Sequence, residues 1–131
     1  MNLSKNFTLS EMTATRYNVK NVPNDTQIEA LKLLCEKVLQ PLRDLYGQPI
    51  HVNSGYRSLQ LNSLIKGAKA SQHCKGEAAD LDAGLNSDNK ILFELIKNNF
   101  DFDQLINEYD YSWIHVSYKK TGNRNQTLVI T

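Results

Sequence analysis

The stretch from Ser71 to Asp80 reads SQHCKGEAAD, and it constrains the fold more than any other part of the sequence. It places an imidazole at His73 and a carboxylate at Asp80, with the small residues Ala78 and Ala79 directly before the aspartate. Two small residues indicate a closely packed backbone, so the stretch predicts a loop that enters a buried β-strand. A half-buried carboxylate needs a partner. A divalent metal is one such partner, because imidazole nitrogen and carboxylate oxygen are both ordinary zinc ligands.

A third ligand is available later in the chain, in the segment WIHVSY at Trp113–Tyr118. The segment alternates like a strand and puts His115 on the face opposite Ile114 and Val116. The chain has three histidines, of which only His51 stands apart from these two stretches. Taken singly, the residues of the first stretch would be read as a surface histidine and a strand-end cap. Together, two histidines and one aspartate with an open fourth position are typical of a catalytic zinc site.

Composition limits the classes of protein to which the chain can belong. Its 131 residues predict a single domain over 1–131, with residues 1–22 as an N-terminal arm. The net charge of +1 does not predict binding to nucleic acid or to an anionic membrane. The start of the chain lacks the continuous apolar run of a signal peptide, and no segment has the length of a transmembrane helix. Two cysteines, Cys35 and Cys74, are too few for a disulfide scaffold.

The hydrophobic pattern predicts an α+β fold, with helices packed on one face of a mostly antiparallel sheet. An apolar stripe from Ile28 to Leu45 indicates the main helix, which Pro41 should kink and Gly47 should end. The last third of the chain reads as an antiparallel meander of three strands. The expected elements are helices at 8–12, 24–46, 58–66 and 86–99, and strands at 49–53, 78–82, 102–108, 113–118 and 127–130.

Three blocks of the sequence together resemble the M15 zinc peptidases, a family of D-alanyl-D-alanine carboxypeptidases and related phage and bacterial peptidoglycan peptidases. The blocks are SGYRS at 54–58, SQHCKGEAAD at 71–80 and WIHVSY at 113–118. The likeness runs from Phe7 to about Arg124, and it is greatest to the short members common in phages. It implies the hedgehog/D-Ala-D-Ala peptidase fold and a zinc ion held by His73, Asp80 and His115.

The resemblance also implies residues that contact the substrate. In this family the arginine of the SGYRS block, here Arg57, holds a carboxylate or carbonyl of the substrate. A guanidinium suits that task because its planar fork matches a carboxylate at two points. Ser54 of the same block and Gln72, next to the first histidine ligand, are expected beside the substrate in supporting roles.

The general base is where the chain departs from the family. Many members place a glutamate three residues before the last histidine, and here that position is Ser112. Glu108 is the preferred base, because it ends the strand expected beside that of His115, and Asp110 is the second choice. With zinc lowering the pKa of water towards about 7, the base would take the proton and later pass it to the leaving amine.

The function implied by the resemblance is zinc-dependent hydrolysis of a peptide bond in the peptidoglycan stem peptide, by a D-Ala-D-Ala carboxypeptidase or an endolysin-type endopeptidase that acts as a monomer. A catalytically inactive, zinc-containing module that binds cell-wall peptide is the alternative, and Ser112 favours it. A plain structural domain of a phage particle is a third possibility. Without a signal peptide, the protein is expected to stay in the cytoplasm until lysis or a holin-like partner releases it to the wall.

Overall fold

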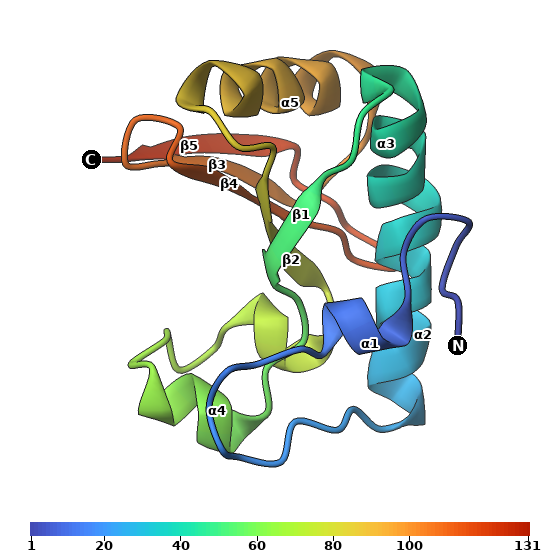
Figure 1. Ribbon diagram of the computed structural model, residues 1–131, viewed down its shortest axis with the longest axis vertical. Helices are drawn as coiled ribbons and strands as arrows, with labels where there is room; N and C mark the ends of the chain where they lie inside the picture. The colour runs from blue at the N-terminus through green and yellow to red at the C-terminus, as the bar shows by residue number, and fades with distance from the viewer.

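A five-stranded sheet with helices against one of its faces forms the body of the protein in the computed structural model, which describes residues 1–131 (Figure 1). The helices are α1 (Leu9–Met12), α2 (Asp25–Leu34), α3 (Gln40–Tyr46), α4 (Leu59–Leu64) and α5 (Asn86–Asn99), with a π-helical turn at Cys35–Leu39 and a 3-10 turn at Gln72–Lys75. The strands are β1 (His51–Ser54), β2 (Ala78–Asp82), β3 (Gln104–Glu108), β4 (Trp113–Ser117) and β5 (Gln126–Ile130).

The main helix is continuous from α2 through the π-helical turn into α3, and it stands along one side of the sheet (Figure 1). It begins at Asn24, whose side chain accepts a hydrogen bond from the Gln27 amide at 2.9 Å. The π-helical turn lies just before Pro41, which has no N–H to donate to a regular helical turn. The helix ends at Gly47 in the left-handed conformation, with φ of 74°, as predicted.

The sheet has the order β1-β2-β4-β3-β5, and every neighbouring pair is antiparallel except β3 with β5. The mostly antiparallel α+β fold is therefore confirmed. The predicted meander is wrong in its last step, because β5 pairs in parallel with β3 and not with β4. Since β4 already pairs with β2 on one side and β3 on the other, the free edge of β3 is the place left for β5.

The two faces of the sheet differ in chemistry because residues alternate along each strand. Toward the helices, β2 and β4 direct Ala79, Leu81, Ile114 and Val116, all of them fully buried in the hydrophobic core. The residues between them, among them Asp80 and His115, are only partly buried and lie on the face that the helices leave open. The fold therefore puts the polar residues of the two central strands together on one open surface.

The N-terminal arm braces the segment that joins β1 to α4. The Met12 carbonyl at the end of α1 accepts a hydrogen bond from the Tyr56 amide at 2.8 Å. Asn21 donates to the Tyr56 carbonyl at 2.9 Å and accepts from the Ser58 amide at 2.7 Å. The arm thus fixes the backbone of the SGYRS block. Separately, none of the helices combines the length and the apolar character that crossing a membrane requires.

Candidate metal centre

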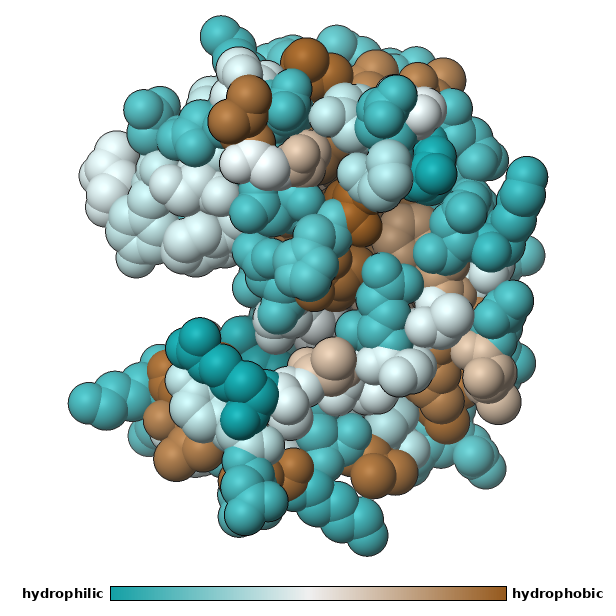
Figure 2. Space-filling view, in the orientation of Figure 1, coloured by the Kyte–Doolittle hydropathy of each residue, from teal (hydrophilic) through white to brown (hydrophobic).

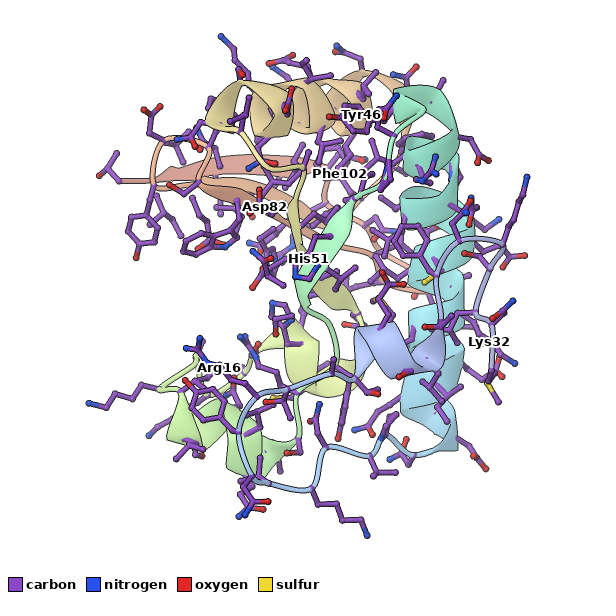
Figure 3. The ribbon with its side chains drawn as sticks, in the orientation of Figure 1. Arg16, Lys32, Tyr46, His51, Asp82 and Phe102 are labelled. Carbon is purple, nitrogen blue, oxygen red and sulfur yellow. The ribbon has the colours of Figure 1, made fainter.

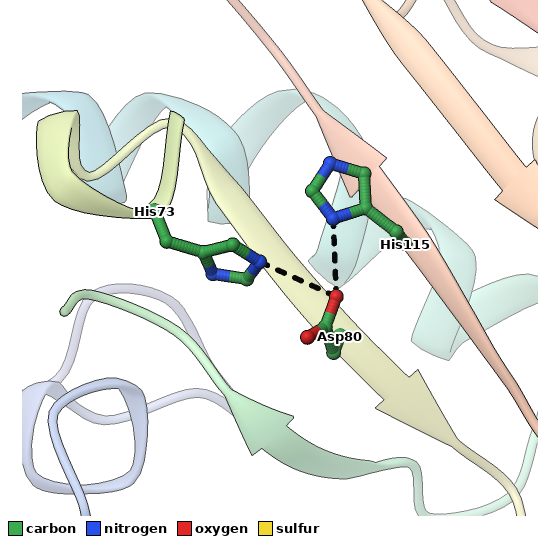
Figure 4. Close-up of side chains that lie close together, drawn as sticks. All are labelled: His73, Asp80 and His115. Carbon is green, nitrogen blue, oxygen red and sulfur yellow. Dashed lines mark hydrogen bonds and ion pairs between the residues drawn. The ribbon is translucent and has the colours of Figure 1, made fainter. Parts of the chain in front are cut away.

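The three residues that the sequence singled out as metal ligands lie together in the structure (Figure 4). His73 comes from the 3-10 turn, Asp80 from β2 and His115 from β4. One ligand atom from each lies within 4.8 Å of those from the other two. Asp80 Oδ1 is 3.3 Å from His73 Nε2 and 3.1 Å from His115 Nδ1. Two nitrogens and one oxygen therefore surround a common point.

Strand register brings Asp80 and His115 together. They are direct partners in the antiparallel pairing of β2 with β4. Their neighbours Ala79 and Val116 are also partners, and both face the helices in the core. A slip of one residue would turn His115 into the core and expose Val116, so burial on the other face of the sheet fixes this contact.

His73 is positioned by the SGYRS block. Its Nδ1 lies 2.7 Å from the Gly55 carbonyl oxygen, which can only accept a hydrogen bond. A neutral His73 therefore carries its proton on Nδ1, which leaves Nε2, the nitrogen that faces Asp80, free to bind a metal. A side chain on Gly55 would collide with the Met12 carbonyl, so the close approach requires glycine. The Arg57 amide also donates to the His73 carbonyl at 3.1 Å, which fixes the turn.

Distances and charge both fit a zinc ion. Two atoms that bind one zinc at about 2.0–2.1 Å with tetrahedral angles lie roughly 3.3 Å apart. The observed separations of 3.3 and 3.1 Å match that spacing. Burial acts to raise the pKa of Asp80, but the charge and hydrogen bonds of His73 and His115 outweigh it and hold that pKa well below its ordinary value. The carboxylate is thus kept in the ionised form that a metal requires.

The ligands lie in the wall of a cleft of about 670 Å³, a size common for ligand-binding sites. Figure 2 shows the hollow at the left, between the part of the molecule that holds the sheet and the part that holds α4. The residues that line it are mostly polar or charged, and the chemically important ones besides the ligands are Arg57, Gln72, Asp103, Glu108, Lys119 and Arg124.

Glu108 reaches the cleft from the last position of β3. Its Oε2 accepts a hydrogen bond from the Trp113 indole N–H at 3.0 Å, across the β3–β4 pair. Burial, and then the charge of Asp80, raise the pKa of Glu108 above its ordinary value. The half-buried carboxylate is therefore a stronger base than an exposed glutamate.

The turn after Glu108 explains why Asp110, the second candidate base, and Ser112 are absent from the cleft. Tyr109, Asp110 and Tyr111 are all left-handed, with φ of 53°, 55° and 59°. Asn107 stabilises this unusual turn by accepting from the Tyr111 amide at 2.6 Å. Asp110 is exposed on the turn, and the Ser112 hydroxyl donates to the Tyr109 carbonyl at 2.6 Å. Neither Asp110 nor Ser112 lines the cleft.

The other residues named from sequence occupy different places. Arg57 lines the cleft and donates to the Ser71 hydroxyl at 3.3 Å. Gln72 also lines it, but Ser54 faces a neighbouring hollow instead. His51 is exposed and stands opposite Asp82 in the pairing of β1 with β2 (Figure 3), and it does not belong to the group of candidate ligands.

Sequence reasoning missed one group in the cleft, the ion cluster of Asp103, Lys119 and Arg124. The Asp103 side chain is fully buried, and Arg124 contacts it with two guanidinium nitrogens at 2.9 and 2.8 Å. Lys119 Nζ lies 3.8 Å from the same carboxylate. An aspartate between the apolar Phe102 and Leu105 could have signalled a buried charge that needs a partner, because such charges are rarely left unpaired.

Comparison with known proteins agrees with this site. A family model described as Peptidase M15 matches residues 5–117, which include all three ligands, Arg57 and Glu108. The chain belongs to the peptidase M15 family. This M15 chain is also 51% identical over 47 residues to the zinc D-Ala-D-Ala carboxypeptidase of Streptomyces albus G. That match covers 35% of this chain and 18% of the Streptomyces enzyme, so the chain spans less than a fifth of that relative. The predicted family is confirmed.

Proposed function

We propose that this M15 chain hydrolyses a peptide bond in the stem peptide of peptidoglycan, with a zinc ion held by His73, Asp80 and His115. The observation that carries the proposal is the convergence of these three ligand atoms in the wall of an open cleft, with Asp80 3.3 and 3.1 Å from the two histidines. A structural zinc site is closed by four protein ligands, whereas three ligands beside a cleft leave a position for water or substrate.

The residues around the ligands supply the remaining chemistry. Zinc in such a site polarises a carbonyl and lowers the pKa of water to about 7. Glu108 takes the proton of the attacking water and returns it to the leaving amine. The hydrogen bond from Trp113 holds one Glu108 oxygen, at 3.0 Å, and leaves the other for this transfer. The raised pKa of Glu108 suits a base that must first accept a proton and then donate it.

Arg57 orients the acidic end or a carbonyl of the peptide. Its only hydrogen bond through the side chain goes to Ser71, and its Nε is buried without an acceptor. Arg57 lines the cleft, and its guanidinium has more donors than the one that Ser71 accepts from, so a carboxylate can accept from it. Gln72 supports the turn that carries His73, and the place of Ser54 in the neighbouring hollow suits contact with a more distant part of a peptide.

The alternative is a zinc-containing module that binds cell-wall peptide without turnover. It rests on Ser112, which stands where many family members have their glutamate. The presence of Glu108 in the cleft favours the enzyme, because a base is supplied from a neighbouring strand. The endolysin-type role in a phage, the monomeric state and release from the cytoplasm at lysis belong to the proposal as well. Their support is the resemblance of the three sequence blocks to short phage members.

Digestion of purified peptidoglycan, followed by mass spectrometry of the fragments, tests the proposal. Loss of single terminal D-alanine residues would identify a carboxypeptidase, and cuts inside the stem or cross-link would identify an endopeptidase. The zinc content of the same preparation is measured in parallel. One zinc per chain with no released fragment would contradict the enzyme and support the binding module, whereas absence of zinc under saturating conditions would contradict both.

A further inference from the structure

A second charged group stands in the cleft beside the metal centre. Asp103, just before β3, is completely buried and accepts from the Arg124 amide at 3.1 Å, from Nε at 2.9 Å and from a terminal guanidinium nitrogen at 2.8 Å. Lys119 Nζ is 3.8 Å away. Both cations line the cleft, and their side chains are 36% and 52% exposed for Lys119 and Arg124.

The cluster carries surplus positive charge. One carboxylate faces two cations. Hydrogen bonding to Arg124 holds the pKa of Asp103 at about 2, so the carboxylate is ionised near neutral pH and the cluster keeps one surplus positive charge. The Lys119 ammonium has only Asp103 near it as an acceptor. The second terminal nitrogen of Arg124 makes no hydrogen bond within the protein. These donors remain available to an anion in the cleft.

The loop that carries the two cations is preorganised. Lys119 and Asn123 are joined by two hydrogen bonds. The Lys119 amide donates to the Asn123 side-chain oxygen at 2.8 Å, and the Asn123 side-chain nitrogen donates to the Lys119 carbonyl at 2.9 Å. The Asn125 amide donates to the Phe102 carbonyl at 2.8 Å, which ties the loop to the start of β3. Because the loop is already ordered, little conformational freedom remains to be lost when it binds a ligand.

One turn of the chain connects this cluster with both the metal centre and Arg57. Ser71 accepts from Arg57 at 3.3 Å, and the next residue, Gln72, donates to Asp103 at 3.0 Å. His73 follows directly as a metal ligand. Arg57 and the Asp103 cluster are thus hydrogen-bonded to neighbouring residues of the turn that carries His73, and all of them line one cleft.

We propose that Lys119 and Arg124 form a second anion-binding subsite, which selects peptides that carry a carboxylate in addition to the one bound by Arg57. The substrate class is an acidic peptide with a free side-chain or α-carboxylate close to the scissile bond. This inference rests on the proposed function, since it specifies the substrate of the same cleft. Both cations lie beyond residues 5–117, the part of the chain that the family model matches.

A matched pair of peptides tests the subsite. The two substrates differ only in one residue near the scissile bond, which carries a carboxylate in one and a carboxamide in the other. For the parent protein, kcat/KM should be at least about tenfold higher for the acid at low salt, and the ratio should fall as salt is added. In the double variant Lys119→Gln, Arg124→Gln the ratio should fall toward one.

The control is Lys120→Gln, which removes the same charge one residue away, outside this cleft. It should keep the parent ratio. A ratio near one in the parent, or an equal ratio in the parent and the double variant, would overturn the subsite. If the double variant does not fold because Asp103 loses its partner, Lys119→Gln alone decides the question, since it leaves the pair of Asp103 with Arg124 in place. That variant should at least halve the ratio, and an unchanged ratio would overturn the subsite.

Failure of the proposed function would look different. If the parent hydrolyses no peptide, the same pair is measured by calorimetric binding to the zinc-loaded protein. Preferred binding of the acid in the parent and in Lys120→Gln, lost in the Lys119 and Arg124 variants, would support the subsite without catalysis. Equal binding of both peptides by the parent would overturn it.

Discussion

Two aspartates in the same cleft, Asp80 and Asp103, are each flanked by two basic side chains, yet their partners differ in kind. Asp80 contacts two imidazoles, His73 and His115, at 3.3 and 3.1 Å. Asp103 contacts a guanidinium at 2.8 Å and lies 3.8 Å from an ammonium. An imidazole can give up its proton near neutral pH and offer a lone pair, whereas a guanidinium cannot.

This difference in partners separates the proposed metal centre at Asp80 from the proposed anion-binding subsite at Asp103. At Asp80 each neutral imidazole offers one nitrogen lone pair, so a divalent ion can be bound by all three residues. At Asp103 the partners keep their charge, so the carboxylate stays in a permanent ion cluster and the surplus charge faces the cleft. The geometry of the two groups is similar, and the pKa of the partners decides their chemistry.

The largest effect is expected when a candidate metal ligand is removed, because only the group at Asp80 should bind zinc. His73→Ala, Asp80→Ala and His115→Ala should each abolish tight zinc binding and all hydrolysis, because sites with three protein ligands rarely survive the loss of one. Asp103→Asn should keep its zinc. The measurement is zinc per chain after dialysis against a weak chelator.

The control for the ligand variants is His51→Ala, which removes the one histidine outside the site and should leave zinc content unchanged. Equal zinc content in the three ligand variants and in His51→Ala would contradict the assignment of the ligands.

The next largest effect is expected at Glu108, the proposed base in the same cleft. Glu108→Gln keeps the shape of the side chain but cannot take a proton, so kcat should fall by about two to four orders of magnitude. Zinc content and melting temperature should stay close to those of the parent. Asp110→Asn is the matched control, since Asp110 is exposed outside the cleft and its loss should be mild. The reverse pattern would move the role of base to Asp110.

Removal of the charge at Asp103 should act on stability rather than on the metal. Asp103→Asn leaves Arg124 without its buried carboxylate, and we expect the free energy of unfolding to fall by about 2 kcal/mol, the usual range for a hydrogen bond to a charged group. Asp101→Asn, an exposed aspartate two residues earlier, should change little. Denaturant unfolding of both variants in chelator gives the comparison, and equal stabilities would show that the cluster contributes nothing.

The grouping of the candidate metal ligands was predictable from sequence because two of them lie in strands with a clear pattern. Alternation of apolar and polar residues in β2 and β4 places Asp80 and His115 on the same face, and pairing then brings them together. His73 is different. The sequence singled it out with Asp80 in the stretch at 71–80, but its position depends on the Gly55 carbonyl, which no strand or helix period predicts. The helices were found for the same reason as the strands, through the period of their buried residues.

The C-terminal strand was predicted, but its pairing was not predictable on these grounds. β5 is an edge strand with every residue exposed, so no alternation of burial indicates its partner or its direction. Its parallel pairing with β3 follows from the loop at 119–125, which Asp103 and Phe102 hold across the end of the sheet. The ion cluster escaped notice because its members are 16 and 21 residues apart in sequence.

A smaller effect is expected at Arg57, the cation on the other side of the His73 turn. Arg57→Lys keeps the charge but loses the planar fork, so kcat/KM should fall by about tenfold, or roughly 1.4 kcal/mol, with zinc retained. The change should weaken acid and amide peptides of the matched pair alike, because the two differ at the other subsite. Unchanged kinetics on all wall peptides would return Arg57 to the role of a surface residue.

The smallest effect is the dependence of stability on pH. Arg124 and then the other groups around Asp103 lower its pKa in the folded protein from an ordinary value of 3.8 to about 2. A lowered pKa in the folded state means that the unfolded chain binds its proton first as the pH falls, so the stabilisation is complete above about pH 4 and is lost between about pH 4 and pH 2. Because Arg124 is half exposed, solvent weakens the pair, and we expect only about 1 kcal/mol of extra loss relative to Asp103→Asn over that range. Urea unfolding of zinc-free parent and variant at pH 5, 4, 3 and 2 measures the difference. The other acidic groups, Asp80 included, titrate in both proteins and cancel, so parallel curves would contradict an ion pair at Asp103.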